Sequence, residues 1–460
     1  MNRILLSGLL ILCFSCTQSQ EPIEFWLTDP KANILFQKQT EAQEVSHTEL
    51  LLTIDSETSF QLMDGFGFTL SQGSASHLLG MSDSARASIL QELFGKGEKD
   101  LGVSYLRLAV AASDLNEFPF SYNDLADSLA TDPELESFSL SHDTVDVLPV
   151  LRQIFDINPA IKLMASPWSP PKWMKDNKDT RGGSLLEEYE GTYACYLVNY
   201  IQAMKELGFE IDALTIQNEP LHPGNNPSLL MLPEQQARFI GIHLGPAFVE
   251  NGIKTKILIY DHNADRPDYP ITVLSDSIAN PFIDGSAFHL YGGEISALSA
   301  VHQAFPDKNI YFTEQWIGAP GSLEGDMPWH IKNLIVGASR NWAKTVLEWN
   351  LSSNPSLTPH TDRGGCDQCL GAIAIDGDSV VRNPAYYVIA HASKFVDPGS
   401  VRIDSNFIGE LPNVAFLRPD GKKVLIVLND SDTPKEFQIA DKEKTFSASL
   451  NPGATGTWVW

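Results

Sequence analysis

The stretch Ala213-Leu-Thr-Ile-Gln-Asn-Glu-Pro220 decides the fold of this chain, together with a second stretch, Asn309-Ile-Tyr-Phe-Thr-Glu-Gln-Trp316. Each is a short apolar, β-branched run that stops at a carboxylate, Glu219 in the first and Glu314 in the second. A buried barrel strand has this pattern when its last side chain projects from the C-terminal rim. About three strand-and-helix units of roughly 30 residues each separate the two glutamates. Two such strands of one eight-fold barrel lie across its mouth from each other.

A pair of carboxyl groups facing each other across a barrel mouth suits glycoside hydrolysis. One carboxyl group protonates the leaving oxygen, and the other attacks the sugar or activates water. We therefore predict a retaining β-glycosidase with Glu219 as acid/base and Glu314 as nucleophile. Retention requires the carboxyl groups to lie roughly 5 Å apart, and inversion about 6.5 Å or more. Asn218, directly before the acid/base, is placed to grip the sugar 2-hydroxyl.

The region from residue 60 onward alternates apolar runs with amphipathic stretches, which is the pattern of βαβ units. The clearest amphipathic stretch runs from Tyr193 to Leu207 and ends near Gly208. Eight strand candidates in about 300 residues predict a (β/α)₈ barrel. These candidates are Asp64–Leu70, Val103–Ala109, Ile161–Ala165, Ala213–Ile216, Lys256–Tyr260, Gly285–Leu290, Ile310–Thr313 and Lys344–Trp349.

Both ends of the chain contain short β-like pieces without a helical period. We expect these pieces to form one β-sandwich beside the barrel. The predicted α/β fold is therefore a (β/α)₈ TIM barrel with a side domain built from both chain ends. Its parts are a signal segment at 1–16, N-terminal sandwich strands at 22–59, the catalytic barrel at 60–385 and the C-terminal sandwich at 386–460.

The N-terminal segment 1–16 resembles a bacterial lipoprotein signal and is set aside from the fold. A basic residue is followed by the apolar run Ile4–Leu12 and then by Cys13-Phe-Ser-Cys16. Cys16 would become the lipidated first residue. The Cys-Phe pair ahead of it departs from the usual pattern, so ordinary secretion after a conventional cleavage is the alternative. We expect an exported protein, anchored through Cys16 to the bacterial cell envelope or else secreted.

The composition is that of a globular enzyme and argues against several partners. A hydrophobic fraction of 43% with 10% aromatic residues excludes a disordered chain. The 58 acidic residues outnumber the 32 basic ones, for a formal charge of −26, and so negative a surface repels phosphate backbones. We therefore predict no nucleic-acid partner. After the N-terminal segment no apolar run reaches the roughly 18 residues that span a membrane, so the lipid anchor is the membrane contact we expect.

The cysteines outside the signal do not form a metal or redox motif. Cys195 lies in a helical pattern, where we expect a buried free thiol. Cys366-Asp-Gln-Cys369 lies in a loop and lacks the second ligand pair of a zinc site. A local disulfide is favoured in an oxidising compartment, and two free thiols are the alternative.

Other strand ends supply side chains to the same rim. Arg107 is placed to pair with a catalytic carboxylate and keep it ionised, with a structural salt bridge under the mouth as the alternative. Asp114 is a candidate acceptor for a sugar hydroxyl, with a helix cap as the alternative. Trp168 and Trp173 stand among prolines that forbid a helix. A rim tryptophan suits the face of a pyranose ring, with loop packing as the alternative for both.

The sixth and eighth strands end on further candidates. His289 and Tyr291 end the sixth strand, where Tyr291 is placed to orient the nucleophile. Trp349 ends the eighth strand and is a candidate pocket wall. The pair Asp261-His262, after the fifth strand, is a weaker candidate.

These motifs occur in the order found in one known family. They are Asp64-Gly-Phe-Gly67, Arg107 to Asp114, Ala165-Ser-Pro-Trp168, Asn218-Glu-Pro220, His289-Leu-Tyr291, Phe312-Thr-Glu314, Glu348-Trp-Asn-Leu351 and Ser393-Lys-Phe395 with Pro398-Gly399. From about residue 60 to 403 the chain resembles glycoside hydrolase family 30. The resemblance implies a barrel with a side β-sandwich, retention of configuration and no metal or cofactor. It also implies Glu219 and Glu314 as the catalytic pair, and a glucose subsite lined by Asp114, Trp168, Asn218, His289, Tyr291 and Trp349.

The resemblance leaves the substrate open. Asp114 and Trp168 match the glucose-binding members of the family, and the loops Leu221–Asn226 and Gly364–Cys369 resemble those of bacterial β-1,6-glucan and β-glucoside hydrolases. We therefore expect β-1,6-glucan or β-1,6-branched glucan as the substrate. A glucosylceramidase is the first alternative, and a surface glycan-binding protein without turnover is the second, although both glutamates are present.

Overall fold

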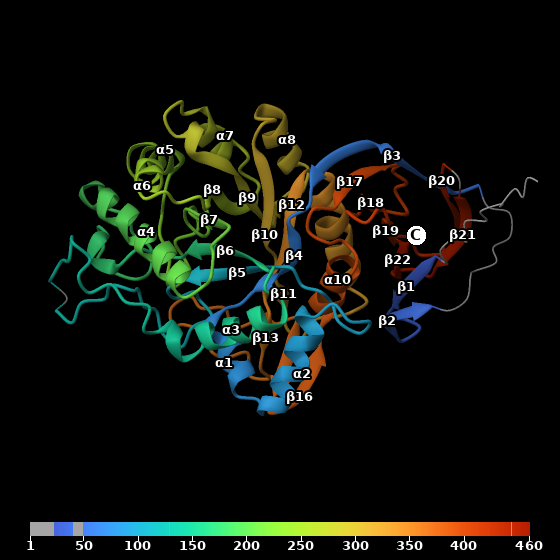
Figure 1. The fold of residues 1–460 in the computed structure, drawn as a ribbon, viewed down its shortest axis with the longest axis horizontal. Coiled ribbons are helices and arrows are strands. Elements are labelled where there is room, and N and C mark those ends of the chain that lie inside the picture. Colours follow the sequence, from blue (N-terminus) through green and yellow to red (C-terminus); the bar gives the residue numbers. More distant parts are fainter. Residues whose placement is uncertain (1–22, 40–48, 128, 443) are drawn as a thin grey trace, which may run out of the picture.

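The computed structural model describes residues 23–39, 49–127, 129–442 and 444–460. The expected signal segment, with Cys16, lies outside these residues. A closed barrel of eight parallel strands and a nine-stranded sheet lie beside each other (Figure 1). The fold prediction of a TIM barrel with a β-sandwich is confirmed.

Each predicted barrel strand is present, and the eight strands follow one another around the barrel in chain order. They are β4 (Gly65–Thr69), β5 (Tyr105–Val110), β6 (Lys162–Pro167), β7 (Ala213–Thr215), β8 (Lys256–Ala264), β9 (Ile283–Gly293), β10 (Asn309–Glu314) and β12 (Ala343–Asn350). The pairing of β12 with β4, with Val346 opposite Phe66, closes the barrel.

Helices follow the barrel strands and cover its outside. They are α1 (Gln72–Leu79) and α2 (Asp83–Phe94) after β4, α3 (Val147–Ile157) after β5, α4 (Glu190–Glu206) after β6, α5 (Pro233–Arg238), η4 (Phe239–Leu244) and α6 (Gly245–Glu250) after β7, α7 (Asp268–Ser275) after β8, α8 (Ala297–Ala304) after β9, α9 (Asp326–His330) and η6 (Ile331–Ala338) after β10, and α10 (Pro384–Ser393) after β12. The predicted amphipathic helix is α4, which buries Tyr193, Tyr196 and Tyr200 and ends where Gly208 takes a φ of 88°.

Inward-facing side chains fill the barrel in layers, because alternate residues of a strand point to the same side. The lower layer is an apolar cluster made of Tyr105, Met164, Ala213, Leu258, Ala287, Tyr311 and Leu347. The next layer lies two residues further along six of these strands. It consists of buried side chains, namely Arg107, Ser166, Thr215, His289, Thr313 and Trp349. The apolar layer therefore closes the bottom of the barrel, and the second layer forms the floor of its mouth.

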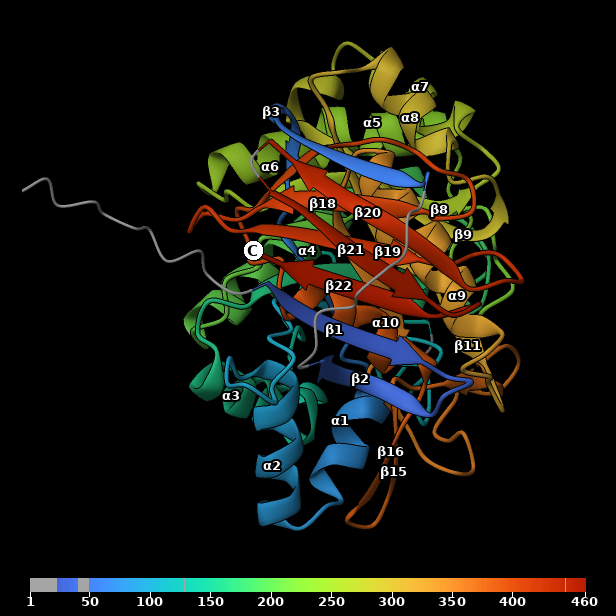
Figure 2. The same ribbon diagram turned by 90° about the vertical axis from the view of Figure 1, so that its right-hand side faces the viewer.

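The side domain draws its strands from both chain ends, as predicted. Figure 2 views this sheet face on. Its order is β2 (Ile34–Gln39), β1 (Glu24–Asp29), β22 (Thr455–Val459), β19 (Lys423–Leu428), β18 (Asn413–Leu417), β17 (Val401–Ser405), β3 (Leu51–Leu62), β20 (Lys435–Asp441) and β21 (Lys444–Leu450). The helix α10 lies between the sheet and the barrel (Figure 1).

The strand β19 is a continuous apolar run and is buried on both faces. Val424 and Ile426 join the core shared with the barrel, whereas Leu425 packs in a second core with Phe437. Phe437 lies on β20, and its ring meets that of Trp458 edge-on at 5.8 Å. The hairpin β20–β21 thus covers the far face of the sheet as the second layer of the sandwich. The sequence prediction missed this hairpin.

Short strands and one disulfide shape the loops at the barrel mouth. The short strands are β11 (Ile317–Gly318), β13 (Ser352–Ser353), β14 (Cys369–Leu370), β15 (Ile373–Asp376) and β16 (Ser379–Arg382). Cys366 and Cys369 form the favoured disulfide. Cys195 is a free thiol but is exposed, so the prediction of a buried thiol was wrong: Cys195 falls on the solvent side of α4. In the described part of the chain, no helix is both long and apolar enough to cross a membrane.

Candidate active site

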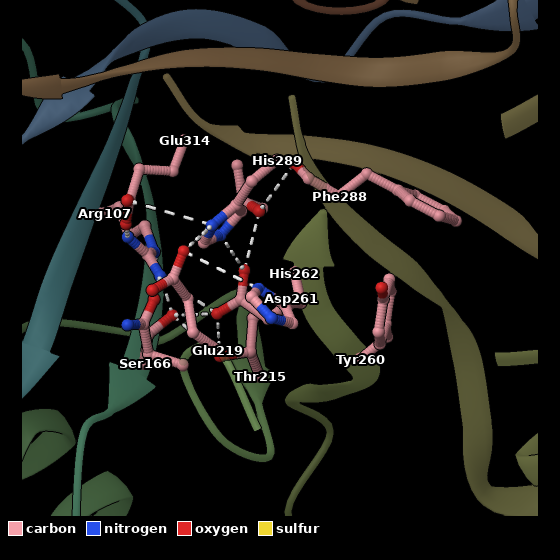
Figure 3. Close-up of polar contacts among 12 residues, drawn as sticks. Arg107, Ser166, Thr215, Glu219, Tyr260, Asp261, His262, Phe288, His289 and Glu314 are labelled. Carbon is pink, nitrogen blue, oxygen red and sulfur yellow. Dashed lines mark hydrogen bonds and ion pairs between the residues drawn. The ribbon is translucent and has the colours of Figure 1, made fainter. Parts of the chain in front are cut away.

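Arg107 on β5 is the centre of a buried polar network at the floor of the barrel mouth (Figure 3). Its side chain has no exposed surface. Nη1 donates to Glu314 Oε2 at 2.5 Å, and Nη2 donates to Asn218 Oδ1 at 2.6 Å and Asp261 Oδ2 at 2.9 Å. Burial opposes the charge, but Asp261 and Glu314 outweigh it and raise the pKa of the guanidinium. Arg107 therefore stays charged and holds both carboxylates in place.

A kink in β8 brings Asp261 next to this guanidinium. Tyr260 and Asp261 have φ values of 73° and 63°, and the pairing of β8 with β9 shifts register at this point. A regular strand would point successive side chains to opposite faces. The irregular strand instead brings both Asp261 and His262 into the mouth.

Asp261 is held from every side in the second layer of the barrel. Its Oδ2 accepts hydrogen bonds from Arg107 and from Thr215 Oγ1 at 2.7 Å, and its Oδ1 accepts from Thr313 Oγ1 at 2.6 Å and faces His289 Nε2 at 3.1 Å. Burial raises the pKa of this carboxyl, but Arg107 and His289 outweigh burial and hold the pKa well below its ordinary value. Asp261 is therefore ionised at any working pH.

His289 on β9 connects Asp261 with Glu219. Its Nδ1 lies 3.1 Å from Glu219 Oε1, on the opposite side of the ring from Asp261. Burial lowers the pKa of the imidazole, but the carboxylates of Glu314, Asp261 and Glu219 outweigh burial and raise it to about 9. At neutral pH His289 is therefore an imidazolium that donates to both carboxylates.

Glu219 lies in a turn beyond β7, which ends at Thr215. The residue has a φ of 48°, and its N–H donates to the Asp261 carbonyl at 3.0 Å. Its Oε2 accepts from Asn225 Nδ2 at 3.3 Å. Burial raises the pKa of the carboxyl, but the imidazoles of His262 and His289 outweigh it and lower the pKa. The proton of the Glu219–His289 pair therefore rests on His289 in the free protein.

Glu314 is the last residue of β10 and is held from two sides. Tyr291 donates its hydroxyl to Glu314 Oε1 at 2.9 Å, as its position predicted, and Arg107 holds Oε2. The Tyr291 residue is 38% exposed, so its ring stands at the open mouth.

The two glutamates lie close together because both face one nitrogen. His289 Nδ1 is 3.1 Å from Glu219 Oε1 and 3.8 Å from Glu314 Oε1. The two oxygens would be farthest apart if they lay on opposite sides of this nitrogen. Because the ring carbons of His289 occupy one side of Nδ1, the two oxygens cannot lie on opposite sides of it. Glu219 Oε1 and Glu314 Oε1 are therefore closer to each other than the sum of their distances to Nδ1.

Asp114 and an aromatic group border this carboxylate pair. Burial and the charge of Glu314 raise the pKa of the Asp114 carboxyl to about 8. The rings of Trp168 and Trp349 lie 5.4 Å apart, and the guanidinium beneath them is 4.9 Å from the Trp168 centroid. Trp316 and the disulfide pack against these two tryptophans. The mouth thus offers an apolar wall beside a charged floor.

The loops after four barrel strands, β5, β6, β7 and β12, are tied together around the mouth. Asn226, after β7, donates to the Asp362 carbonyl at 3.0 Å and accepts from Thr180 at 2.7 Å, in the loop after β6. Thr361, in the loop after β12, donates its backbone N–H to the Asp114 carbonyl at 3.0 Å. These bonds fix the wall that carries Asn225 and the disulfide.

The structure brings all nine predicted site residues together, namely Glu219, Glu314, Asp114, Trp168, Asn218, His289, Tyr291, Trp349 and Arg107. Trp173 lies elsewhere: its Nε1 donates to Asn123 Oδ1 at 3.0 Å inside the packed loops. The sequence prediction missed Ser166, Thr215, Thr313 and Asn225, and ranked Asp261 and His262 too low.

Comparisons with known proteins agree with this geometry. Residues 63–396 match the glycosyl hydrolase family 30 TIM-barrel domain, and residues 399–458 match the family 30 beta sandwich domain. The chain belongs to glycosyl hydrolase family 30. This family 30 chain is 32% identical over 439 residues to the endo-1,6-beta-D-glucanase neg1 of Aspergillus fumigatus, covering 89% of the chain and 87% of that protein.

Two further family 30 relatives differ in their named activities. The lysosomal acid glucosylceramidase of Mus musculus is 30% identical over 445 residues, covering 90% of this chain and 84% of that protein. Among solved structures, the endo-beta1,6-glucanase BT3312 superposes with a TM-score of 0.88 at 31% identity, covering 95% of this chain and 99% of that one. The chain is thus a family 30 glycoside hydrolase with relatives that act on different glucosides.

Proposed function

We propose that this enzyme is a retaining, endo-acting β-1,6-glucanase in which Glu314 is the nucleophile and Glu219 the acid/base. The observation that carries the proposal is the approach of both carboxylates to His289 Nδ1, at 3.1 and 3.8 Å. Retaining enzymes hold the two carboxyl groups about 5–5.5 Å apart, and inverting enzymes about 6.5–9.5 Å. The approach of both oxygens to one nitrogen admits the retaining separation and excludes all but the shortest inverting separations.

The network supplies each step of a double displacement. Glu314, oriented by Arg107 and Tyr291, attacks the anomeric carbon and forms a glycosyl ester. His289 passes its proton across 3.1 Å to Glu219, which gives it to the departing glycosidic oxygen and is left as a carboxylate. Water, deprotonated by Glu219, then releases the sugar from Glu314.

The glucan substrate is supported by the relatives and by the wall of the mouth. Two proteins named as endo-1,6-β-glucanases cover most of the chain at more than 30% identity. Asp114 and the pair Trp168–Trp349 offer a hydroxyl acceptor beside flat apolar faces, which suit a glucose ring. Glucosylceramide is the second candidate, because the mouse glucosylceramidase is 30% identical over 90% of the chain.

We also propose that the mature enzyme is exported and anchored to the cell envelope through Cys16. The apolar run Ile4–Leu12 before Cys13-Phe-Ser-Cys16 supports this. Cys16→Ala is expected to abolish labelling by radioactive palmitate. Labelling that persists in this variant would contradict the anchor.

Products from β-1,6-glucan, laminarin and glucosylceramide test the substrate, with Glu314→Gln as the inactive control. Oligosaccharides from β-1,6-glucan, released with the β-anomer formed first, support the proposal. Glucose alone from the same glucan would contradict endo action. Ceramide release with both glucans left unhydrolysed would make glucosylceramide the substrate instead of glucan. An α-anomer formed first would show inversion of configuration and overturn retention.

A further inference from the structure

Three side chains at the barrel mouth form a set of metal-type ligands. Glu219, His262 and His289 each offer one ligand atom, and these atoms lie within 4.8 Å of one another. Glu219 Oε1 is 3.6 Å from His262 Nδ1 and 3.1 Å from His289 Nδ1. We propose that this triad, the Glu219–His262–His289 site, binds a divalent transition-metal ion such as Zn²⁺, which inhibits the enzyme. The inhibition, unlike the binding, rests on the proposed role of Glu219.

The two spacings from Glu219 to the histidines of the triad fit the coordination of zinc. Zinc holds nitrogen and oxygen ligands at about 2.0–2.2 Å in a tetrahedron, so neighbouring ligand atoms stand about 3.3 Å apart. The two distances from Glu219 Oε1 lie on either side of this value. Glu219 and His262 are each 7% exposed and His289 is fully buried, so solvent reaches the triad on the side of Glu219 and His262, and the fourth position would lie there. Water fills this position in three-ligand zinc sites.

His262 gives an independent reason to expect a ligand. Its Nδ1 is buried and finds no hydrogen-bond partner among the described residues. A buried polar atom without a partner is destabilising, because it has lost its hydrogen bonds to water. The kink at Asp261 aims this atom at Glu219 rather than at solvent. A metal ion at the triad satisfies the atom directly.

His289 is already supported in the way that metal-binding histidines are. A ligating imidazole usually donates its other N–H to a carboxylate, which fixes the ring and raises its basicity. The His289 Nε2 faces Asp261 Oδ1 at 3.1 Å, and Thr313 and Thr215 hold that carboxylate in turn. His289 Nδ1 is thus oriented toward the triad by a rigid second layer.

The charge of the floor favours a cation at this position. Three carboxylates, Glu219, Asp261 and Glu314, face two cations, Arg107 and the His289 imidazolium, so one negative charge is left over. In a buried site, such an excess of negative charge attracts a positive ion. A divalent cation replaces the proton that His289 otherwise holds. It also binds Glu219 Oε1, the oxygen that faces His289, and so blocks proton transfer between the two; sugar cleavage stops while the ion is bound.

Metal binding is tested on the full chain without any turnover. The protein is freed of metal and titrated with Co²⁺, whose visible absorption reports nitrogen and oxygen ligands in a low-coordinate site, and Zn²⁺ is then added in competition. We expect one site per chain. We also expect Zn²⁺ to inhibit β-1,6-glucan hydrolysis competitively with the substrate.

Two variants locate the site. His262→Phe keeps a flat ring but removes the ligand nitrogen. We expect this variant to bind Zn²⁺ at least tenfold more weakly. Its inhibition by Zn²⁺, measured relative to its own metal-free activity, should weaken by the same factor. His243→Gln is the matched control, because His243 also lies beside a glutamate, 3.4 Å from Glu190, but is 30% exposed on η4 and belongs to no three-ligand group among the described residues. This variant is expected to bind Zn²⁺ as the unaltered chain does.

The possible outcomes separate the metal site from the proposed reaction. No Co²⁺ signal, or unchanged Zn²⁺ affinity in folded His262→Phe, overturns the site. If His262→Phe does not fold, anomalous scattering from zinc-soaked crystals of the unaltered protein decides. A peak among the three ligands supports the proposal, and a peak elsewhere or none overturns it. A chain that binds Zn²⁺ at the triad but hydrolyses no glucan refutes the proposed function and leaves the metal site standing.

Discussion

Arg107 and Glu314 are joined across the barrel floor by a 2.5 Å contact between Nη1 and Oε2. The same guanidinium lies 2.9 Å from Asp261, and its side chain is fully buried. One cation therefore fixes the proposed nucleophile and the carboxylate that orients His289. Because Asp261 is fully buried and Glu314 nearly so, little water can replace Arg107 if the guanidinium is removed.

Replacing Arg107 with lysine is expected to cost both activity and stability. Lysine keeps the charge but lacks the planar fork that reaches several acceptors at once. Breaking a buried ion pair costs about 3–5 kcal/mol, and the retained charge should limit the loss in free energy of unfolding to about half of that. We expect kcat on β-1,6-glucan to fall at least 100-fold, since Glu314 and Asn218 lose their common donor. Urea unfolding and steady-state kinetics measure the two effects, and near-normal values of both would contradict the central role of Arg107.

His289→Gln is expected to damage proton delivery more than nucleophilic attack. Its effect should depend on the leaving group, because general acid catalysis contributes about 10²–10⁴-fold to the departure of a poor leaving group. Activity on β-1,6-glucan should fall within that range, while cleavage of an aryl β-glucoside with an acidic phenol should fall far less. Glu314→Gln is the control and should abolish both activities. If His289→Gln lost the same factor of activity on both substrates, His289 would act only by positioning other groups and not by delivering a proton.

The sequence predicted those site residues that regular strand geometry places. Arg107, His289 and Trp349 were found because they lie near strand ends. Ser166, Thr215 and Thr313 lie in the same inward layer and were open to the same reasoning, but short hydroxyl side chains in an apolar strand give no catalytic signal. Their role follows only from Asp261, to which Thr215 and Thr313 donate.

Other features depend on contacts that one strand cannot reveal. Asp261 and His262 face the mouth because Tyr260 and Asp261 have positive φ values. The residue pattern of β8 does not predict these φ values. Asn225 reaches Glu219 because its loop is tied to the loop after β12. In contrast, β20 alternates apolar and polar residues around Phe437 and Ile439, so this strand was predictable from its period of two.

The disulfide Cys366–Cys369 is expected to serve substrate binding more than stability. It closes a very short loop, and the entropic gain from a cross-link is small for short loops. However, it packs on Trp316, Trp168 and Trp349, which form the apolar wall. Cys366→Ser with Cys369→Ser should therefore raise KM several-fold, with Tm changed by only a few degrees. Cys195→Ser, which removes the exposed thiol, is the control and should change neither quantity. A large fall in Tm with unchanged KM would show that the disulfide serves stability rather than substrate binding.

Asp114→Asn is expected to make the folded chain more stable at alkaline pH. Because the pKa of the buried carboxyl is raised to about 8, the folded state holds a proton that the unfolded chain releases near pH 4. The stabilisation from this proton is complete below about pH 4 and is lost as pH rises through 8. The variant should match the unaltered chain at pH 4 and unfold at higher urea at pH 8. The variant should also lose at least tenfold in kcat/KM on glucan. Equal unfolding midpoints of the variant and the unaltered chain at pH 8 would contradict the raised pKa of Asp114.

His391 on α10 should make the contact between the barrel and the sheet sensitive to acid. Its ring is fully buried, with Nδ1 2.8 Å from Thr457 Oγ1 and Nε2 2.8 Å from Thr28 Oγ1. Burial lowers the pKa of the imidazole to about 3. Between about pH 6.5 and 3 the unfolded chain therefore carries a proton that the folded chain does not, and the free energy of unfolding falls as pH falls.

His391→Gln measures this contribution, because glutamine keeps a donor and an acceptor but does not titrate. Relative to the variant, the unaltered chain should lose up to about 1.4 kcal/mol per pH unit across the window, which is the limit for one proton. Urea unfolding at pH 7, 6, 5 and 4 gives the difference between the two chains at each pH, so the titration of other groups cancels. A difference that stays constant from pH 7 to 4 would mean that His391 becomes protonated in the folded chain, and hence that the interface between α10 and the sheet admits water.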